Sequence, residues 1–236
     1  MQNTKNSQKI RRMVIIGMFA AMAYAAMLVI HIKVSFLTLD VKDAVITLCG
    51  LYFGPVSALL ISVIVPLLEF FTVSDTGLYG LIMNVLGSVS FSVTAALIYK
   101  WKKNFFGAIL ALVSAACTMT GVMLLGNLLV TPYFMVADVT TVRGMIPTLL
   151  LPFNLLKAIV NVGVVLLLYK HLSIGLRKAG FLPRRQDAVE KGETDVPRAK
   201  PSRLRTVCVT LAAILLIVGS MLIIFLVLGG SVGFGT

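Results

Sequence analysis

Residues 44–72 read AVITLCGLYFGPVSALLISVIVPLLEFFT, and this stretch decides how often the chain crosses a membrane. The run is almost entirely apolar, but Gly54-Pro55 divides it, because proline cannot continue a helix interior and glycine relieves a tight turn. We therefore expect a short helix over about residues 42–53 and a longer one over about 55–72, kinked at Pro66. The short helix is thin for a bilayer span of about 20 residues, so we expect its neighbours to screen it.

The composition of the whole chain excludes a soluble protein. Of its 236 residues, 58% are hydrophobic and 13% are charged, and the mean hydropathy is +0.99. An average soluble domain has roughly 45–50% apolar and about 25% charged residues. These values exclude an ordinary soluble enzyme, a disordered chain and a secreted disulfide scaffold. We predict an all-α integral membrane protein with several crossings.

Five further apolar runs complete the predicted helices. They cover about residues 13–32, 78–99, 105–130, 148–169 and 207–228. The first run is longer than the apolar region of a signal peptide, so we expect it to be retained. The predicted organisation is a cytoplasmic N-terminus, a six-helix membrane core, a basic cytoplasmic linker, an extra transmembrane helix and a tail, over residues 1–12, 13–170, 171–206, 207–228 and 229–236.

The basic residues set the predicted orientation. Three crossings between residues 44 and 99 place 17 lysines and arginines on one side, in segments 1–12, 100–103 and 170–205. The other side receives three, which are Lys33, Lys42 and Arg143. Basic loops stay in the cytoplasm, so we expect a cytoplasmic N-terminus, external loops over 33–43 and 131–147, and an external C-terminal tail. The net charge of +12 therefore indicates contact with anionic lipid and not with nucleic acid.

The sequence contains no pattern that predicts catalysis. It lacks the phosphate-binding motif G-x-x-x-x-G-K-[ST], and its two histidines lie at opposite ends of the core. The three cysteines lie in apolar runs without metal-ligand or redox spacing. We predict that the chain is not an enzyme and holds neither a metal nor a cofactor.

Lys157 is the most informative single residue. It lies about 14 Å inside the sixth helix at 1.5 Å per residue, where an ammonium group costs several kcal/mol unless it faces a polar cavity or a partner. Asn154 shares its helical face, and Asn127 and Asn84 add amides in the fifth and fourth helices. Together these side chains predict a polar pocket that opens outward.

Other interpretations of these polar residues stay open. Lys157 can snorkel toward an interface or form a structural ion pair with Asp43 or Glu69. The asparagines can serve only as hydrogen bonds between helices.

The first helix carries small residues at four-residue spacing, which are Gly17, Ala21 and Ala25. Such a stripe permits close helix approach. It serves either packing within the chain or docking of another membrane subunit.

Several segments together resemble the substrate-binding S components of energy-coupling factor (ECF) vitamin transporters, closest to the riboflavin-specific type. The resemblance covers about residues 10–172. The first feature that carries it is the alanine-rich first helix. The others, in chain order, are Phe36-Leu37-Thr38-Leu39-Asp40, Asp43, Leu51-Tyr52-Phe53-Gly54-Pro55, Gly126-Asn127, Thr131-Pro132-Tyr133 and Leu151-Pro152-Phe153-Asn154-Leu155-Leu156-Lys157.

The resemblance implies a six-helix fold that binds one vitamin near the external surface, with the first loop as a lid. Asn127, Asn154 and Lys157 match positions that hydrogen-bond the flavin or its ribityl chain, and Phe36 to Asp40 match the lid. Gly17, Ala21 and Ala25 match the face that meets a transmembrane coupling subunit. Two separate ATPase subunits would drive transport. The candidate substrate site comprises Phe36, Leu37, Thr38, Leu39, Asp40, Asp43, Asn84, Asn127, Asn154 and Lys157.

The resulting hypothesis is a cell-membrane subunit that captures riboflavin as a transported substrate. One alternative keeps the family but changes the vitamin or small cofactor. Another is a standalone channel or scaffold protein, and a scaffold would bind no ligand. The seventh helix and its basic linker depart from the six-helix pattern and have no role implied by the resemblance.

The topology can be tested by cysteine labelling from outside intact cells. We expect an impermeant thiol reagent to label Asp75→Cys and Asp138→Cys but not Lys102→Cys, because only the first two lie in predicted external segments. Labelling of Lys102→Cys would mean that residues 44–99 cross the membrane twice and not three times.

Overall fold

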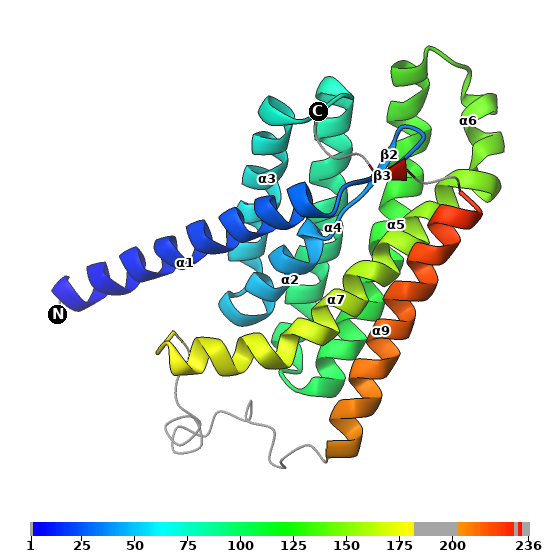
Figure 1. Ribbon diagram of the computed structural model, residues 1–236. Coiled ribbons are helices and arrows are strands. Elements are labelled where there is room, and N and C mark those ends of the chain that lie inside the picture. The colour runs from blue at the N-terminus through cyan, green and yellow to red at the C-terminus, as the bar shows by residue number, and fades with distance from the viewer. Residues whose placement is uncertain (1, 182–202, 229–230, 233–236) are drawn as a thin grey trace.

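The computed structural model describes residues 2–181, 203–228 and 231–232, and most of its elements are helices (Figure 1). In chain order they are α1 (Gln2–Val29), β1 (Ile32–Val34), β2 (Leu37–Leu39), α2 (Lys42–Phe53), α3 (Pro55–Thr72), α4 (Gly77–Trp101), α5 (Phe105–Met135), α6 (Val139–Met145), the π-helical turn η1 (Ile146–Leu150), α7 (Leu151–Lys178), α9 (Arg203–Leu226) and β3 (Ser231–Val232).

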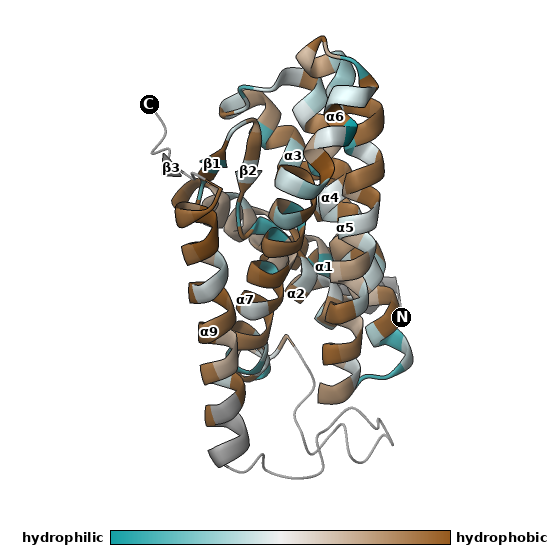
Figure 2. Ribbon diagram, turned by 90° about the vertical axis from the view of Figure 1, so that its right-hand side faces the viewer, coloured by the Kyte–Doolittle hydropathy of each residue, from teal (hydrophilic) through white to brown (hydrophobic). Residues whose placement is uncertain are grey.

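Six stretches of the described residues are long and apolar enough to cross a membrane. They lie in α1, α3, α4, α5, the continuous run Val139–Lys178 and α9. Figure 2 shows apolar residues along most of α9, and its Leu215, Leu222 and Leu226 are exposed. Exposed leucines are expected where a helix surface faces lipid. The all-α membrane fold with an additional C-terminal helix is confirmed.

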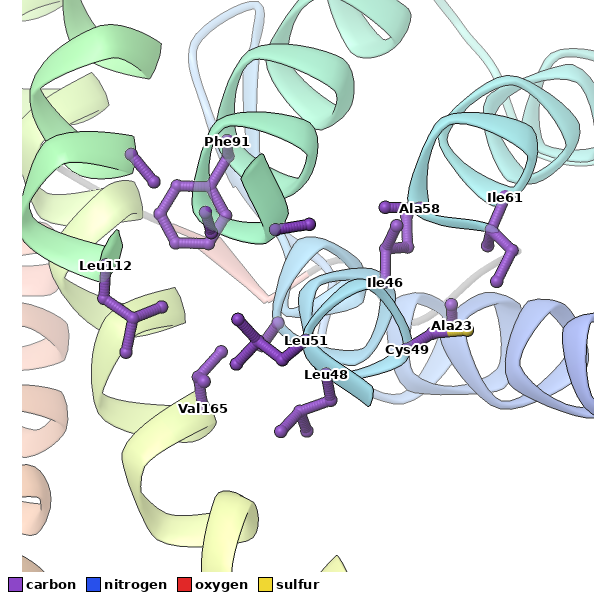
Figure 3. Packing of buried hydrophobic residues seen from close by; sticks show 14 of the residues in the cluster. Ala23, Ile46, Leu48, Cys49, Leu51, Ala58, Ile61, Phe91, Leu112 and Val165 are labelled. Carbon is purple, nitrogen blue, oxygen red and sulfur yellow. The ribbon is translucent and has the colours of Figure 1, made fainter. Parts of the chain in front are cut away.

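The break at Gly54-Pro55 lies where the sequence predicts it. Gly54 takes a left-handed backbone conformation with a φ of +94°, and Pro55 is the first residue of α3. Nine of the twelve residues of α2 are buried. The short helix is therefore screened by its neighbours, as expected. Figure 3 shows Ile46, Leu48, Cys49 and Leu51 of α2 among side chains from α3, α4, α5 and α7.

The helix α1 runs obliquely to the other helices (Figure 1) and crosses α2 and α3. Arg12 donates hydrogen bonds to the Phe53 carbonyl at 3.4 Å and to Ser57 Oγ at 3.2 Å. Arg11 donates to the Gly180 carbonyl and lies over the Phe181 ring. The basic end of α1, the α2–α3 turn and the end of α7 therefore lie together on one side of the molecule.

Two of the predicted external loops are wrong in detail. Residues 33–43 contain the antiparallel hairpin of β1 and β2 and the first turn of α2. Residues 131–147 are mostly helical, because α5 continues through Pro132 to Met135 and α6 begins at Val139. A proline removes one helix hydrogen bond but is tolerated in a membrane helix whose neighbours satisfy the freed groups.

The C-terminal boundaries also differ from the prediction. The sixth predicted helix begins at Leu151 and continues to Lys178, so the first residues of the predicted linker are helical. Most of that linker, residues 182–202, lies outside the described residues. The predicted tail contains β3, which pairs with β1.

Packing of α2 leaves no room for a larger residue at Gly50. A Cβ atom there would lie 2.8 Å from the Ala58 Cβ atom and 3.0 Å from the Ala96 Cβ atom, whereas a Cβ at Gly121 would meet nothing within 4 Å. We expect Gly50→Ala to lower the melting temperature of the purified protein, because overpacking a core costs roughly 1–3 kcal/mol. Gly121→Ala is the matched control, and equal melting temperatures of the two variants would contradict the close packing of α2.

Candidate functional site

A cavity lies between the hairpin, α4, α5 and α7. It encloses about 600 Å³ of empty space, part of which is open to solvent. The lining residues are Phe36, Leu37, Thr38, Thr76, Tyr79, Gly80, Met83, Asn84, Met123, Asn127, Val130, Thr131, Phe134, Phe153 and Lys157.

The hairpin places its tip at the cavity. Its two strands are joined by Ser35 and Phe36, and Ser35 takes a left-handed conformation with a φ of +55°. Two-residue hairpin loops need such a conformation. Ile32, Val34, Leu37 and Leu39 are buried in one apolar cluster that also contains residues of α7. The hairpin is therefore anchored by its apolar side chains, and Phe36 and Thr38 contribute to the cavity wall.

Three aromatic rings from different elements meet at the cavity wall. Phe36 of the hairpin lies 6.2 Å from Phe134 of α5, and Tyr79 of α4 also lies 6.2 Å from Phe134, both measured between ring centroids. The planes are inclined by 47° and 62° respectively. Such tilted contacts are favourable between aromatic rings. They form an apolar wall that suits a flat ring system.

Lys157 connects α7 to the hairpin. Its Nζ atom donates to the Thr38 carbonyl at 3.1 Å and to Asp40 Oδ2 at 3.0 Å. The sequence left open an ion pair of Lys157 with Asp43 or Glu69. That alternative is wrong, because the carboxylate that pairs with Lys157 is Asp40. Lys157 also lines the cavity, so the structural ion pair and the polar pocket occur together.

Asn161, one turn further along α7, supports the same junction. Its Nδ2 atom donates to the Asp40 carbonyl at 3.1 Å, and its Oδ1 atom accepts from the Ala44 N–H at 2.8 Å. The end of the hairpin and the start of α2 are thus both bound to α7.

A second buried lysine, Lys42, lies behind the cavity. It forms an ion pair with Glu69 of α3, lies 3.4 Å from Asp40 Oδ2 and donates to Asn84 Oδ1 at 3.1 Å. The Asn84 amide in turn donates to Glu69 Oε1 at 3.1 Å. The amide of Asn84 is therefore held in one orientation where it lines the cavity. The side chain of Lys42 is completely buried, and its predicted position on the external side of the membrane stays a prediction.

Six of the ten predicted substrate residues line the cavity, and four do not. The six are Phe36, Leu37, Thr38, Asn84, Asn127 and Lys157. The other four are buried outside the lining, and they are Leu39, Asp40, Asp43 and Asn154.

Each of these four side chains has other surroundings. Leu39 belongs to the apolar cluster under the hairpin, and Asp40 pairs with the two lysines. Asp43 accepts from Ser88 Oγ at 2.5 Å. Asn154 donates to the Leu150 carbonyl at 2.8 Å, while its Oδ1 atom has no partner among the described residues. A direct substrate contact of Asn154 stays a prediction.

Several lining residues were missed because single apolar residues carry no chemical signal. The spacing of the lining residues is informative, however. On α5 they lie three or four residues apart and therefore share one face of the helix, and they are Met123, Asn127, Val130 and Phe134. Tyr79 and Met83 have the same relation in α4. A stripe that combines an amide with apolar and aromatic residues could have identified this face.

The small residues of α1 lie on the surface. Gly17, Ala21 and Ala25 are exposed, and a Cβ atom at Gly17 would meet nothing within 4 Å. Ala23 and Met27 lie on the opposite side of the helix and are completely buried. The stripe is therefore not used for packing within the described chain.

Comparison with known proteins places the chain in a family. The sequence-family model for the substrate-specific component of ECF transporters matches residues 11–169. The riboflavin transporter RibU of Staphylococcus aureus (strain TCH60) is 31% identical over 183 residues, which covers 73% of this chain and 96% of the relative. A solved S component of a bacterial ECF transporter matches with a TM-score of 0.62 and 30% identity, over 71% of this chain and 98% of its own. The chain therefore belongs to the family of substrate-specific components of ECF transporters and is a multi-pass membrane protein.

Proposed function

We propose that this S component captures riboflavin for uptake across the cell membrane. The observation that carries the proposal is the combination, in one cavity, of an aromatic wall with amide and ammonium groups. A flavin has a flat ring with apolar faces, a polar edge and a hydroxylated side chain. Phe36, Tyr79 and Phe134 offer surfaces for the ring, while Asn84, Asn127 and Lys157 offer polar contacts. The riboflavin transporter that is 31% identical supports the same substrate.

The polar groups of the cavity retain hydrogen-bonding capacity for a ligand. A lysine ammonium has three donors, and two of those on Lys157 are directed at Thr38 and Asp40. The Asn127 amide uses one N–H on the Met123 carbonyl and accepts one bond from Thr131. Each group therefore keeps a donor that a flavin carbonyl or hydroxyl can accept, without loss of its contacts within the protein.

The ECF family implies association with an ECF transporter module. We propose that this module consists of a transmembrane coupling subunit and two ABC-type ATPase subunits that hydrolyse ATP. The exposed stripe of Gly17, Ala21 and Ala25 is the proposed contact with the coupling subunit, because small residues allow another helix to approach closely. We further propose that the N-terminus is cytoplasmic, since the basic end of α1 lies on the same side as the basic end of α7.

Ligand identification tests the proposed substrate directly. We expect freshly purified protein to carry riboflavin, detected by its absorbance and by mass spectrometry of the released ligand. Added riboflavin should lose fluorescence on binding to protein from which the ligand has been removed. A different vitamin in the spectrum would change the substrate but keep the family, and a protein that binds none of these would contradict the proposal.

Replacement of Lys157 tests its role in binding. We expect Lys157→Met to weaken riboflavin binding roughly ten- to hundredfold, because a hydrogen bond from a charged group contributes about 1.5–3 kcal/mol. The fold should persist, since Asp40 keeps Lys42 as a counter-ion at 3.4 Å. Unchanged affinity in a folded Lys157→Met protein would remove this residue from the site.

Lys42→Met is the matched comparison because this lysine is buried and does not line the cavity. It leaves the Glu69 carboxylate without its cationic partner, and breaking a buried pair costs about 3–5 kcal/mol. The melting temperature should therefore fall much further in Lys42→Met than in Lys157→Met.

Enlarging the α1 stripe tests the proposed coupling face. We expect Ala21→Trp to abolish riboflavin uptake by cells while the purified protein binds riboflavin normally, because the side chain points away from the cavity-forming core. Met22→Trp is the control, since it is also exposed but is turned about 100° around the helix. Equal loss of binding and uptake in Ala21→Trp would contradict a role in coupling.

A further inference from the structure

The C-terminal elements α9 and β3 lie beyond the family match, which ends at residue 169. They nevertheless contact the part of the fold that forms the cavity. In Figure 1, α9 runs alongside α7 and ends near the hairpin. The S-component core therefore carries an addition that is in contact with its ligand-side hairpin.

The helix α9 is closely packed on α7. A Cβ atom at Gly163 of α7 would lie 2.7 Å from Ile217 Cγ1 and 3.2 Å from the Ala213 carbonyl oxygen. Ala213 is completely buried. The absence of a side chain at Gly163 allows this approach, so α9 is held against the core as a fixed support.

The C-terminal end of α9 packs beneath the hairpin. Ile224 is completely buried and belongs to one apolar cluster with Ile32, Val34 and Leu37 of the hairpin. Leu228 packs against the same cluster. Side chains from the core, the hairpin and α9 therefore pack together in one hydrophobic cluster.

The strand β3 covers the free edge of the hairpin. The sheet order is β2-β1-β3, with Ile32 opposite Val232 and Lys33 opposite Ser231. A two-stranded hairpin alone is marginally stable, and a third strand stabilises it. The strand β2, on the other side of β1, carries Leu37 and Thr38 of the cavity wall.

The hairpin has a second connection, to the α3–α4 turn. Lys33 donates to the Asp75 carboxylate, and this hydrogen bond lowers the pKa of Asp75 below its ordinary value. Both side chains are exposed, and exposed ion pairs contribute little to stability. The pairing with β3 and the buried contacts of α9 are therefore the stronger restraints on β1.

We propose that α9 and β3 form a strap that holds the hairpin against the cavity and slows the entry and release of ligand. The hairpin supplies part of the cavity wall, so its displacement widens the mouth. The strap stabilises the closed hairpin in the free and in the bound protein alike, because β3 pairs with β1 and not with the ligand. It therefore changes the exchange rates more than the affinity. The identity of the ligand rests on the proposed function, whereas the restraint on the hairpin does not.

Removal of the backbone donors of β3 tests the strap. The variant Ser231→Pro/Val232→Pro lacks both N–H groups and cannot maintain the pairing. The control Ser231→Ala/Val232→Ala keeps both. We expect the proline variant to raise the association and dissociation rates of riboflavin, measured by stopped-flow fluorescence, about tenfold, the factor that about 1.4 kcal/mol of lost pairing produces. The dissociation constant should change by less than about threefold, and the alanine variant should match the natural protein.

Hydrogen–deuterium exchange of residues 30–40, measured without ligand, makes the test independent of riboflavin. We expect faster exchange in the proline variant and in a chain truncated after Leu228, at unchanged melting temperature of the helical core. Unchanged hydrogen–deuterium exchange in the proline variant and in the truncated chain would overturn the proposed strap. Faster exchange combined with unchanged association and dissociation rates of riboflavin would also overturn it. If no variant bound riboflavin, the proposed substrate would fail, and the exchange data alone would decide whether β3 restrains the hairpin.

Discussion

The structure depends on the pairing of four charges in its interior. Asp40 lies within 3.4 Å of Lys42 and 3.0 Å of Lys157, and Lys42 also pairs with Glu69. An unpaired ion inside a membrane protein costs several kcal/mol, so each of these side chains requires its partners. The pairs come from the end of the hairpin, α2, α3 and α7. Satisfying the charges therefore fixes these elements relative to one another.

This requirement explains why a helix too short to span the membrane is stable. The first turn of α2 carries Lys42 and Asp43, which interact with α3 and α4 through Glu69, Asn84 and Ser88. Its remaining turns are packed among small residues such as Ala58 and Ala96. Because nine of its twelve residues are buried, α2 is surrounded mainly by protein and not by lipid, and its length need not match the bilayer.

The cavity lies directly beside the charge cluster, and this position gives it both kinds of surface. Lys157 belongs to these four charges and also lines the cavity. Asn84, which hydrogen-bonds to Lys42 and Glu69, lines it as well. The rings of Phe36, Tyr79 and Phe134 come from the surrounding elements. The same contacts that stabilise the fold also orient the polar groups before a ligand arrives. Preorganised groups bind a ligand with less loss of conformational entropy.

Much of the helical architecture could be predicted from the sequence alone. The lengths of the apolar runs, the distribution of lysine and arginine, and the break at Gly54-Pro55 are local properties, and they placed α2 and α3 at their observed bounds. The polar residues Asn127 and Lys157 were identified for the same reason, since an ionic or amide group in an apolar run is conspicuous by itself.

The tertiary structure alone decided which distant residues meet. Strands of three residues are too short to be recognised by periodicity, so the hairpin was not predicted. Its pairing with β3 joins residues far apart in the chain and depends on α9, which brings residues 231–232 to β1. The sequence suggested Asp43 or Glu69 as an ion-pair partner of Lys157, whereas the structure pairs it with Asp40, because the partner depends on the distances between folded elements. The aromatic wall joins single residues from three elements, and none of them differs locally from an ordinary lipid-facing or core residue.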